Sequence, residues 1–125
     1  MTIQRALDIV DEMKPNTMTR ELKIHFLSEI EQKIYEEILM KHEHTREEAE
    51  VPSYDVGSDP GTVLRVPDMY ARVYTYWIIC QIDEQNRETN EYNNDRMRFE
   101  NAFEEFSDYW TRTRMPLTVR RHFRL

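Results

Sequence analysis

The sequence predicts a small all-α domain of four helices, with a long loop over about residues 42–66 and a basic C-terminal tail. Three observations indicate this fold class. The 125 residues include only two glycines, whereas turn-rich β-sandwiches and glycine-cradled phosphate sites need more. Apolar residues recur at helical spacing through most of the chain. Aromatic residues make up 11%, which is too many for a disordered acidic chain. We therefore expect one helical domain over residues 1–111 and a basic arm over residues 112–125.

The N-terminal half predicts two helices. The first is expected over Ile3–Met13, where apolar residues keep helical spacing and Thr2 is suited to cap the N terminus. Pro15 predicts the turn that follows. The second helix is expected from about Thr19 to Lys41, with its charged residues, Glu31 among them, mostly on the face opposite the apolar one. Its apolar stripe consists of Leu22, Phe26, Leu27, Ile30, Ile34 and Ile38.

The helical pattern fails between residues 42 and 66, which contain Pro52, Pro60 and both glycines. A short extended segment is expected around Val63, Leu64 and Val66. Connections of this length are uncommon in compact domains and often functional. Two interpretations are open: a partner-binding feature, including one that orders on assembly, or a solvated surface loop.

The C-terminal half predicts an antiparallel hairpin of two helices. Pro67 opens the third helix, which runs to about Asn86 and is apolar nearly all round, as expected at the centre of a bundle. Cys80 within it is expected to be a buried small hydrophobic residue. The fourth helix is expected over about Glu91–Arg112, capped by Thr89 or Asn90. It carries an aromatic seam of Tyr92, Phe99, Phe103, Phe106 and Trp110, with Arg96 in the remaining position. The second helix then packs across this hairpin, and the first covers one end.

Charge is divided unevenly along the chain. The net charge is −7, yet the segment 112–125 carries five arginines and no acidic residue. Such an arm is suited to contact an acidic partner or nucleic acid, and the alternative is that it docks on its own acidic body or frays. The residues expected to form a partner or assembly interface are Arg112, Arg114, Arg120, Arg121, Phe123 and Arg124.

The sequence offers no convincing catalytic or cofactor-binding motif, so we expect no enzyme activity, no cofactor and no small-molecule substrate. His42 and His44 are two residues apart, which places them on different faces of a helix, and the His-Glu-x-x-His zinc pattern is absent. A metal site is therefore not expected. The longest apolar stretch, around Trp77 to Cys80, is too short to span a bilayer. Acidic residues interrupt the N-terminal segment, so an export signal is not expected either.

Several short motifs resemble the small head–tail connector proteins of tailed phages and prophages, also called head-completion or adaptor proteins. The most extensive lies in the expected fourth helix and reads Tyr92-Asn93-Asn94, Met97, Phe99, Asn101-Ala102-Phe103, Phe106 and Tyr109-Trp110. Further motifs are the Ile3–Met13 helix ending in Lys14-Pro15-Asn16, the run from Glu29 to Glu37, Val66-Pro67-Asp68-Met69-Tyr70, and Met115-Pro116. The resemblance covers most of residues 1–116, and the basic tail after Met115-Pro116 lies outside it.

The resemblance implies a non-catalytic α-helical subunit that forms a ring beneath the portal and joins the DNA-filled head to the tail. Implied partners are the portal protein, the stopper or tail proteins and other copies of the chain. DNA would pass through the ring without sequence-specific binding, and no membrane is involved. Such a protein would be found in the cytoplasm of the bacterial host during assembly and then in the neck of the virion. The alternative from another class is a small helical regulator or nucleic-acid-associated protein whose Arg-rich tail contacts phosphate.

Overall fold

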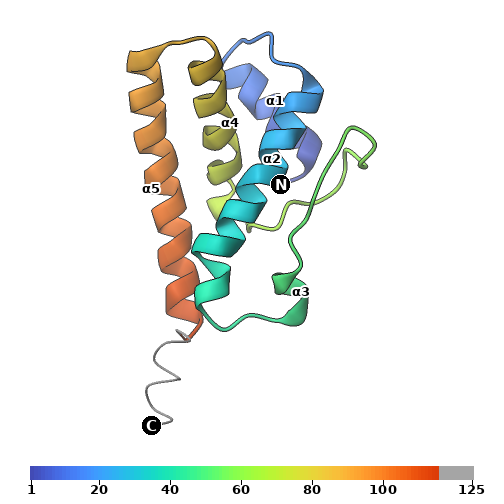
Figure 1. The fold of residues 1–125 in the computed structure, drawn as a ribbon, viewed down its shortest axis with the longest axis vertical. Helices are drawn as coiled ribbons and strands as arrows, with labels where there is room; N and C mark the ends of the chain where they lie inside the picture. The colour runs from blue at the N-terminus through green and yellow to red at the C-terminus, as the bar shows by residue number, and fades with distance from the viewer. Residues whose placement is uncertain (116–125) are drawn as a thin grey trace.

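The computed structural model describes residues 1–115, which form an all-α fold (Figure 1). An isolated antiparallel β-bridge joins Thr2 to Val63. The class predicted from the sequence is thus confirmed. In chain order the elements are α1 (Ile3–Met13), α2 (Arg20–Glu37), the 3-10 turn η1 (Leu39–Lys41), α3 (Arg46–Ala49), the 3-10 turn η2 (Asp68–Tyr70), α4 (Arg72–Gln85) and α5 (Thr89–Thr113).

Helix α1 has the bounds that the sequence predicts. The Thr2 hydroxyl accepts a hydrogen bond from the backbone N–H of Arg5 at 3.1 Å, as an N-cap side chain does. The helix ends at Met13, one residue before Lys14, whose backbone is extended as required before a proline. The residues that α1 buries are Ile3, Ala6, Leu7 and Val10.

Helix α2 is shorter than predicted and faces the core with a different stripe. It ends at Glu37 because Ile38 leaves the helical region, with φ −123° and ψ −64°, and the 3-10 turn η1 follows. This break lets the adjacent residues Ile38 and Leu39 both point into the core. The buried stripe is Lys23, Ile24, Leu27, Ile30, Glu31 and Ile34, so the prediction that Glu31 faces solvent was wrong. Leu22 and Phe26, which were expected in the stripe, are only partly buried.

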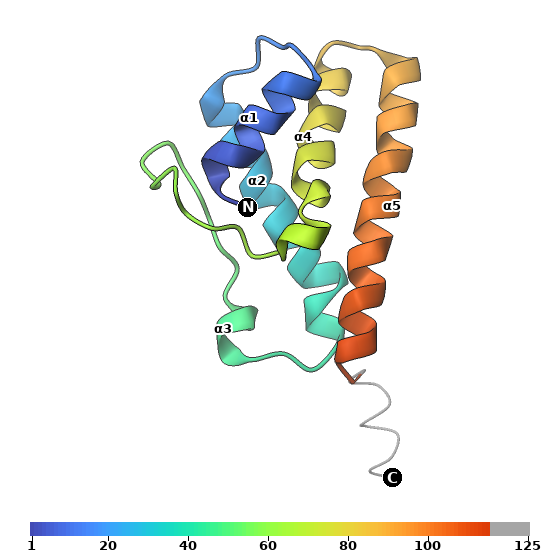
Figure 2. The same ribbon diagram turned by 180° about the vertical axis from the view of Figure 1, so that it is seen from behind.

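Helices α4 and α5 form the predicted antiparallel hairpin, and α4 lies between α5 and the α1–α2 pair (Figures 1 and 2). The start of α4 differs from the prediction, because Pro67 leads into η2 and the α-helix begins only at Arg72. Of the predicted seam on α5, Phe99, Phe106 and Trp110 are buried. Phe103 is only partly buried, and the Lys33 ammonium lies 5.5 Å from its ring centroid.

The turn between α4 and α5 is closed by backbone geometry. Arg87 has φ 58°, the left-handed conformation that usually favours glycine after a helix. The N–H of Glu88 donates to the carbonyl of Asp83 at 3.0 Å, and the N–H of Arg87 donates to that of Glu84 at 3.1 Å. These two bonds form a Schellman motif. As a result α5 begins directly at Thr89, and the predicted cap at Thr89 or Asn90 was wrong.

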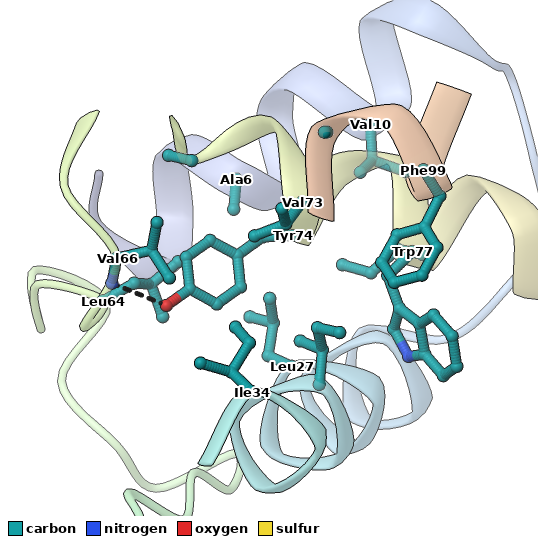
Figure 3. Close-up of a cluster of buried hydrophobic side chains, with 14 of the residues drawn as sticks. Ala6, Val10, Leu27, Ile34, Leu64, Val66, Val73, Tyr74, Trp77 and Phe99 are labelled. Atoms are coloured by element: carbon teal, nitrogen blue, oxygen red, sulfur yellow. Dashed lines mark hydrogen bonds between the residues drawn. The ribbon is translucent and has the colours of Figure 1, made fainter. Parts of the chain in front are cut away.

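The core fills the space between α1, α2 and α4 and extends to α5 (Figure 3). Tyr74 on α4 lies at its centre, fully buried, and its hydroxyl accepts a hydrogen bond from the backbone N–H of Val66 at 2.9 Å. Leu64 and Val66 are buried as well, although they belong to the long loop.

The loop between η1 and η2 follows the side of the body and contains one helical turn, α3, which the sequence did not predict (Figure 2). Thr45 and Glu48 form a capping box at its start. Further along, the loop pairs with the N-terminal segment. The N–H of Ile3 donates to the carbonyl of Thr62 at 3.0 Å, and the N–H of Leu64 donates to that of Met1 at 2.8 Å. The predicted extended segment is therefore present.

Candidate assembly surface

The C-terminal end of α5 carries the first two residues of the interface expected from the sequence. Arg112 lies in the last turn of the helix with its side chain exposed. Arg114 follows the helix in an extended conformation and is partly buried. The other expected interface residues, Arg120, Arg121, Phe123 and Arg124, lie outside the described residues.

Arg114 is held by contacts within its own chain. Its guanidinium lies 4.2 Å from the ring centroid of Trp110, and Nη2 donates to Glu48 Oε2 at 3.3 Å. Partial burial acts to raise the pKa of Glu48, but the bonds from the Thr45 backbone and from Arg114 lower it below its ordinary value. A cation–π contact combined with an ion pair fixes Arg114 against α3 and the end of α5.

Two further hydrogen bonds join the end of α5 to the start of the long loop. The backbone N–H of Glu43 donates to the carbonyl of Met115 at 2.9 Å. The hydroxyl of Thr111 lies 3.4 Å from His42 Nε2. Together with the Arg114 contacts, these bonds fix the chain through Met115 against the start of the long loop.

The exposed face of α5 is acidic just before this point. Glu104, Glu105 and Asp108 lie there with exposed side chains. None of the three forms an ion pair within residues 1–115. The same helix therefore presents unneutralised carboxylates on its outer face and arginines at its C-terminal end.

The long loop is anchored by a buried carboxylate. Glu31 on α2 is fully buried, and its two oxygens accept hydrogen bonds of 2.6 Å from the hydroxyls of Tyr54 and Tyr74. Ser28 adds two bonds to the backbone of Tyr54, accepting from its N–H at 2.8 Å and donating to its carbonyl at 3.1 Å. The guanidinium of Arg65 donates to backbone carbonyls at the end of α3. The segment 42–66 is thus attached to the body at Tyr54 and again near its end, at Leu64 and Val66, rather than being a purely solvated loop.

Both tyrosines of this network are hydrogen-bond donors across the physiological pH range. Burial, followed by the charge of Glu31, raises the pKa of Tyr54 and of Tyr74 well above the ordinary tyrosine value. Sequence reasoning missed Glu31 as a core residue. The signal was present, because position 31 completes the alternating three- and four-residue spacing of Ile24, Leu27, Ile34 and Ile38.

A second cluster missed from the sequence lies at the opposite end of the hairpin. The ammonium of Lys14, just after α1, donates to the carboxylates of Asp83, Glu88 and Glu91. Burial acts to lower the pKa of Lys14, but the three carboxylates raise it above its ordinary value. Burial and the neighbouring Asp95 raise the pKa of Asp83 to about 6. Nothing local in the sequence brings Lys14 to this turn, which lies about seventy residues away along the chain.

The remaining candidate residues of the sequence have local partners. His42 Nδ1 lies 3.1 Å from the carbonyl of Ile38, and His44 Nδ1 lies 2.8 Å from that of His42. Cys80 is fully buried, as predicted, and burial raises the pKa of its thiol to about 12.

Comparison with known proteins gives no relative: no family model, no curated protein and no solved structure matches the chain. Within residues 1–115, none of the helices combines the length and the apolar character that crossing a bilayer requires.

Proposed function

We propose that the chain is a non-catalytic subunit of a phage or prophage head–tail connector. Copies of it would form a ring under the portal and join the head to the stopper or tail. The motifs that resemble this family extend over most of residues 1–116. The all-α fold, built around an antiparallel hairpin, is compatible with that role.

The observation that carries the proposal is the division of charge along α5. Its exposed face carries Glu104, Glu105 and Asp108, while the arm that begins at Arg112 carries five arginines and no acidic residue. In a closed ring each subunit contacts its two neighbours through two different surfaces. Opposite charges on these two surfaces favour one relative orientation of adjacent subunits. An acidic exterior disfavours the alternative of a folded nucleic-acid-binding face.

The structure refines which arginines are available to a partner. Arg114 contacts Trp110 and Glu48 of its own subunit, so it positions the start of the arm. Arg112 and the arginines after Met115 are the candidates for contact with a neighbour or with the portal.

The test is a pull-down on the portal ring encoded by the same phage or prophage, at physiological salt. Three forms are compared: the full chain, a chain ending at Met115, and the full chain with Arg120, Arg121 and Arg124 replaced by glutamine. Ending at Met115 keeps the contacts of Arg114, so a loss of binding does not reflect a damaged fold. The matched control replaces the same three arginines by lysine and keeps their charge.

Binding by the full chain and the lysine control, with loss in the other two forms, is the expected result. Equal binding by all forms would keep the connector role and remove the arm from it. If no form binds an intact portal ring, the connector role fails. Titration with DNA at two salt concentrations would then test the nucleic-acid alternative, which predicts a steep loss of affinity as salt rises.

A further inference from the structure

Three residues whose sequence pattern is typical of a core are covered only in part. Leu22 and Phe26 belong to the predicted apolar stripe of the second helix, and Tyr92 belongs to the predicted seam of the last helix. All three pack against the core but are only partly buried. An apolar helix face that the fold leaves partly uncovered is typical of a binding surface.

These residues line one groove, which lies over α4 between α2 and α5. The two flanking helices diverge toward the α4–α5 turn (Figure 1). The α2–α5 groove consists of two hollows that share Glu84. One hollow, of about 250 Å³, lies beside Leu22 and Phe26, and the other, of about 370 Å³, lies beside Tyr92. Toward its other end Lys33 on α2 reaches an aromatic ring of α5 at 5.5 Å, so the flanking helices meet there.

The lining of the groove is acidic. Glu84 borders both hollows with an exposed side chain and forms no ion pair within residues 1–115. Glu88 lines one of them and shares Lys14 with two other carboxylates. Of the described residues that line the two hollows, Arg87 alone is basic. A segment that fits this groove therefore combines apolar side chains with positive charge.

The sequence that follows Pro116 has this chemistry. It contains four large apolar residues and three arginines, with no acidic residue. The apolar residues all stand at odd-numbered positions and are Leu117, Val119, Phe123 and Leu125. An extended segment presents alternate residues on opposite sides, so this spacing is suited to one apolar side.

The position of Met115 indicates that the occupant comes from a second copy of the chain. The carbonyl of Met115 accepts a hydrogen bond from the N–H of Glu43, beside the end of α5. Tyr92 lies near the start of α5, about 32 Å from Thr113 at a rise of about 1.5 Å per residue. A fully extended chain from Met115 to Phe123 spans at most about 28 Å. Phe123 of the same chain therefore does not reach the hollow beside Tyr92.

We propose that residues 117–125 of one copy bind in the α2–α5 groove of a neighbouring copy. The apolar side chains cover Leu22, Phe26 and Tyr92, and the arginines face Glu84. Such a contact joins two different surfaces, as a closed ring requires. The inference rests on the proposed function, because it assumes that copies of the chain assemble, and it names the surface through which they do so.

The test is photo-crosslinking of the full chain in the absence of the portal, with p-benzoylphenylalanine in place of Phe123. This chain is mixed with an excess of the natural chain labelled with ¹⁵N, so that any adduct on a labelled peptide joins two copies. Covalent dimers are then digested and mapped by mass spectrometry. The expected result is a set of adducts on labelled peptides that contain residues 18–26 or 81–92. Absence of covalent dimers, or adducts confined to other peptides or to the arm's own chain, would overturn the proposal.

A charge reversal in the labelled chain tests the acidic lining. Glu84→Lys is expected to lower the yield of dimers at least about threefold, because it places a positive charge opposite the arginines. The matched control is Glu12→Lys, which reverses an exposed carboxylate of α1 outside the groove and should leave the yield unchanged. Both side chains are exposed, so neither change disturbs the core. Equal yields for the two variants would contradict the proposed contact.

The result is separable from that of the portal pull-down. Portal binding without adducts in the groove would remove this contact and keep the connector role. Adducts in the groove, with no form binding an intact portal ring, would keep the contact between copies and remove the connector role.

Discussion

Replacing Tyr74 by phenylalanine tests whether the buried polar network holds the long loop to the body. The substitution removes one hydroxyl from a fully buried ring and leaves the packing of that ring in place. The hydroxyl bridges two groups, because it donates to Glu31 Oε1 at 2.6 Å and accepts from the N–H of Val66 at 2.9 Å. Both groups lose this partner in Tyr74→Phe.

The expected cost follows from those two groups. A buried donor or acceptor left without a partner costs about 1–3 kcal/mol, and more when the group is charged. Val66 is 1% exposed and Glu31 is 0% exposed, so water does not replace the lost bonds without opening the core. We therefore expect Tyr74→Phe to lower the free energy of unfolding by roughly 3–5 kcal/mol.

The assay is urea unfolding followed by circular dichroism at neutral pH. The matched control is Tyr76→Phe on the same helix, since Tyr76 packs against the core but its hydroxyl has no hydrogen bond within residues 1–115. That control should change stability by less than about 0.5 kcal/mol. Tyr54→Phe removes one hydrogen bond to Glu31 from a half-buried ring, so its loss of stability should lie between those of Tyr74→Phe and Tyr76→Phe. Equal stability of Tyr74→Phe and Tyr76→Phe would refute the reasoning.

Three further predictions concern single residues. Arg87→Gly should be more stable than Arg87→Ala by roughly 0.5–1 kcal/mol in urea unfolding, because φ 58° strains any residue with a Cβ atom; no difference would argue against strain. The folded chain holds the Asp83 proton more tightly than the unfolded chain, because burial raises this pKa from 3.8 to about 6. The contribution of Asp83 to stability should therefore fall as the pH rises through that range. The stability of Asp83→Asn relative to the natural chain should therefore increase over the same pH range. A difference in unfolding free energy between the two proteins that stays constant with pH would contradict this. Arg114→Ala should cost about 0.5–1.5 kcal/mol through its contacts with Trp110 and Glu48, whereas Arg112→Ala should cost almost nothing.

Local sequence signals predicted most of the fold. The Thr2 cap and the apolar spacing after it were sufficient to place α1 at Ile3–Met13. The aromatic seam predicted the hairpin, because Phe99, Phe106 and Trp110 lie on one face of α5 wherever the helix begins and ends. An aromatic face of this kind needs a partner helix to cover it.

The errors arose where distant residues decide the local structure. Glu31 was predicted to be a surface residue because it is charged. Its burial is favourable only because the hydroxyls of Tyr54 and Tyr74 donate hydrogen bonds to it. From the sequence, Lys14 was assigned only to a turn, because its bond to Asp83 forms only when the chain folds. The start of α5 was misplaced because an arginine at the left-handed position of a Schellman motif gives no sequence signal, whereas a glycine would have done so.

The attachment of the long loop at two separate points has a practical consequence for protein engineering. Tyr54 and Leu64 are tied to the body, whereas the stretch around Val56 and Gly57 between them is exposed. Its turn is closed locally, by a bond of 2.7 Å from the N–H of Gly57 to the side chain of Asp55. Because lengthening an exposed turn adds little closure entropy, this tip is a suitable place to insert a fluorophore-binding peptide or an affinity tag. A label there would report on the chain from the side of the body, away from the C-terminal end of α5 (Figure 1).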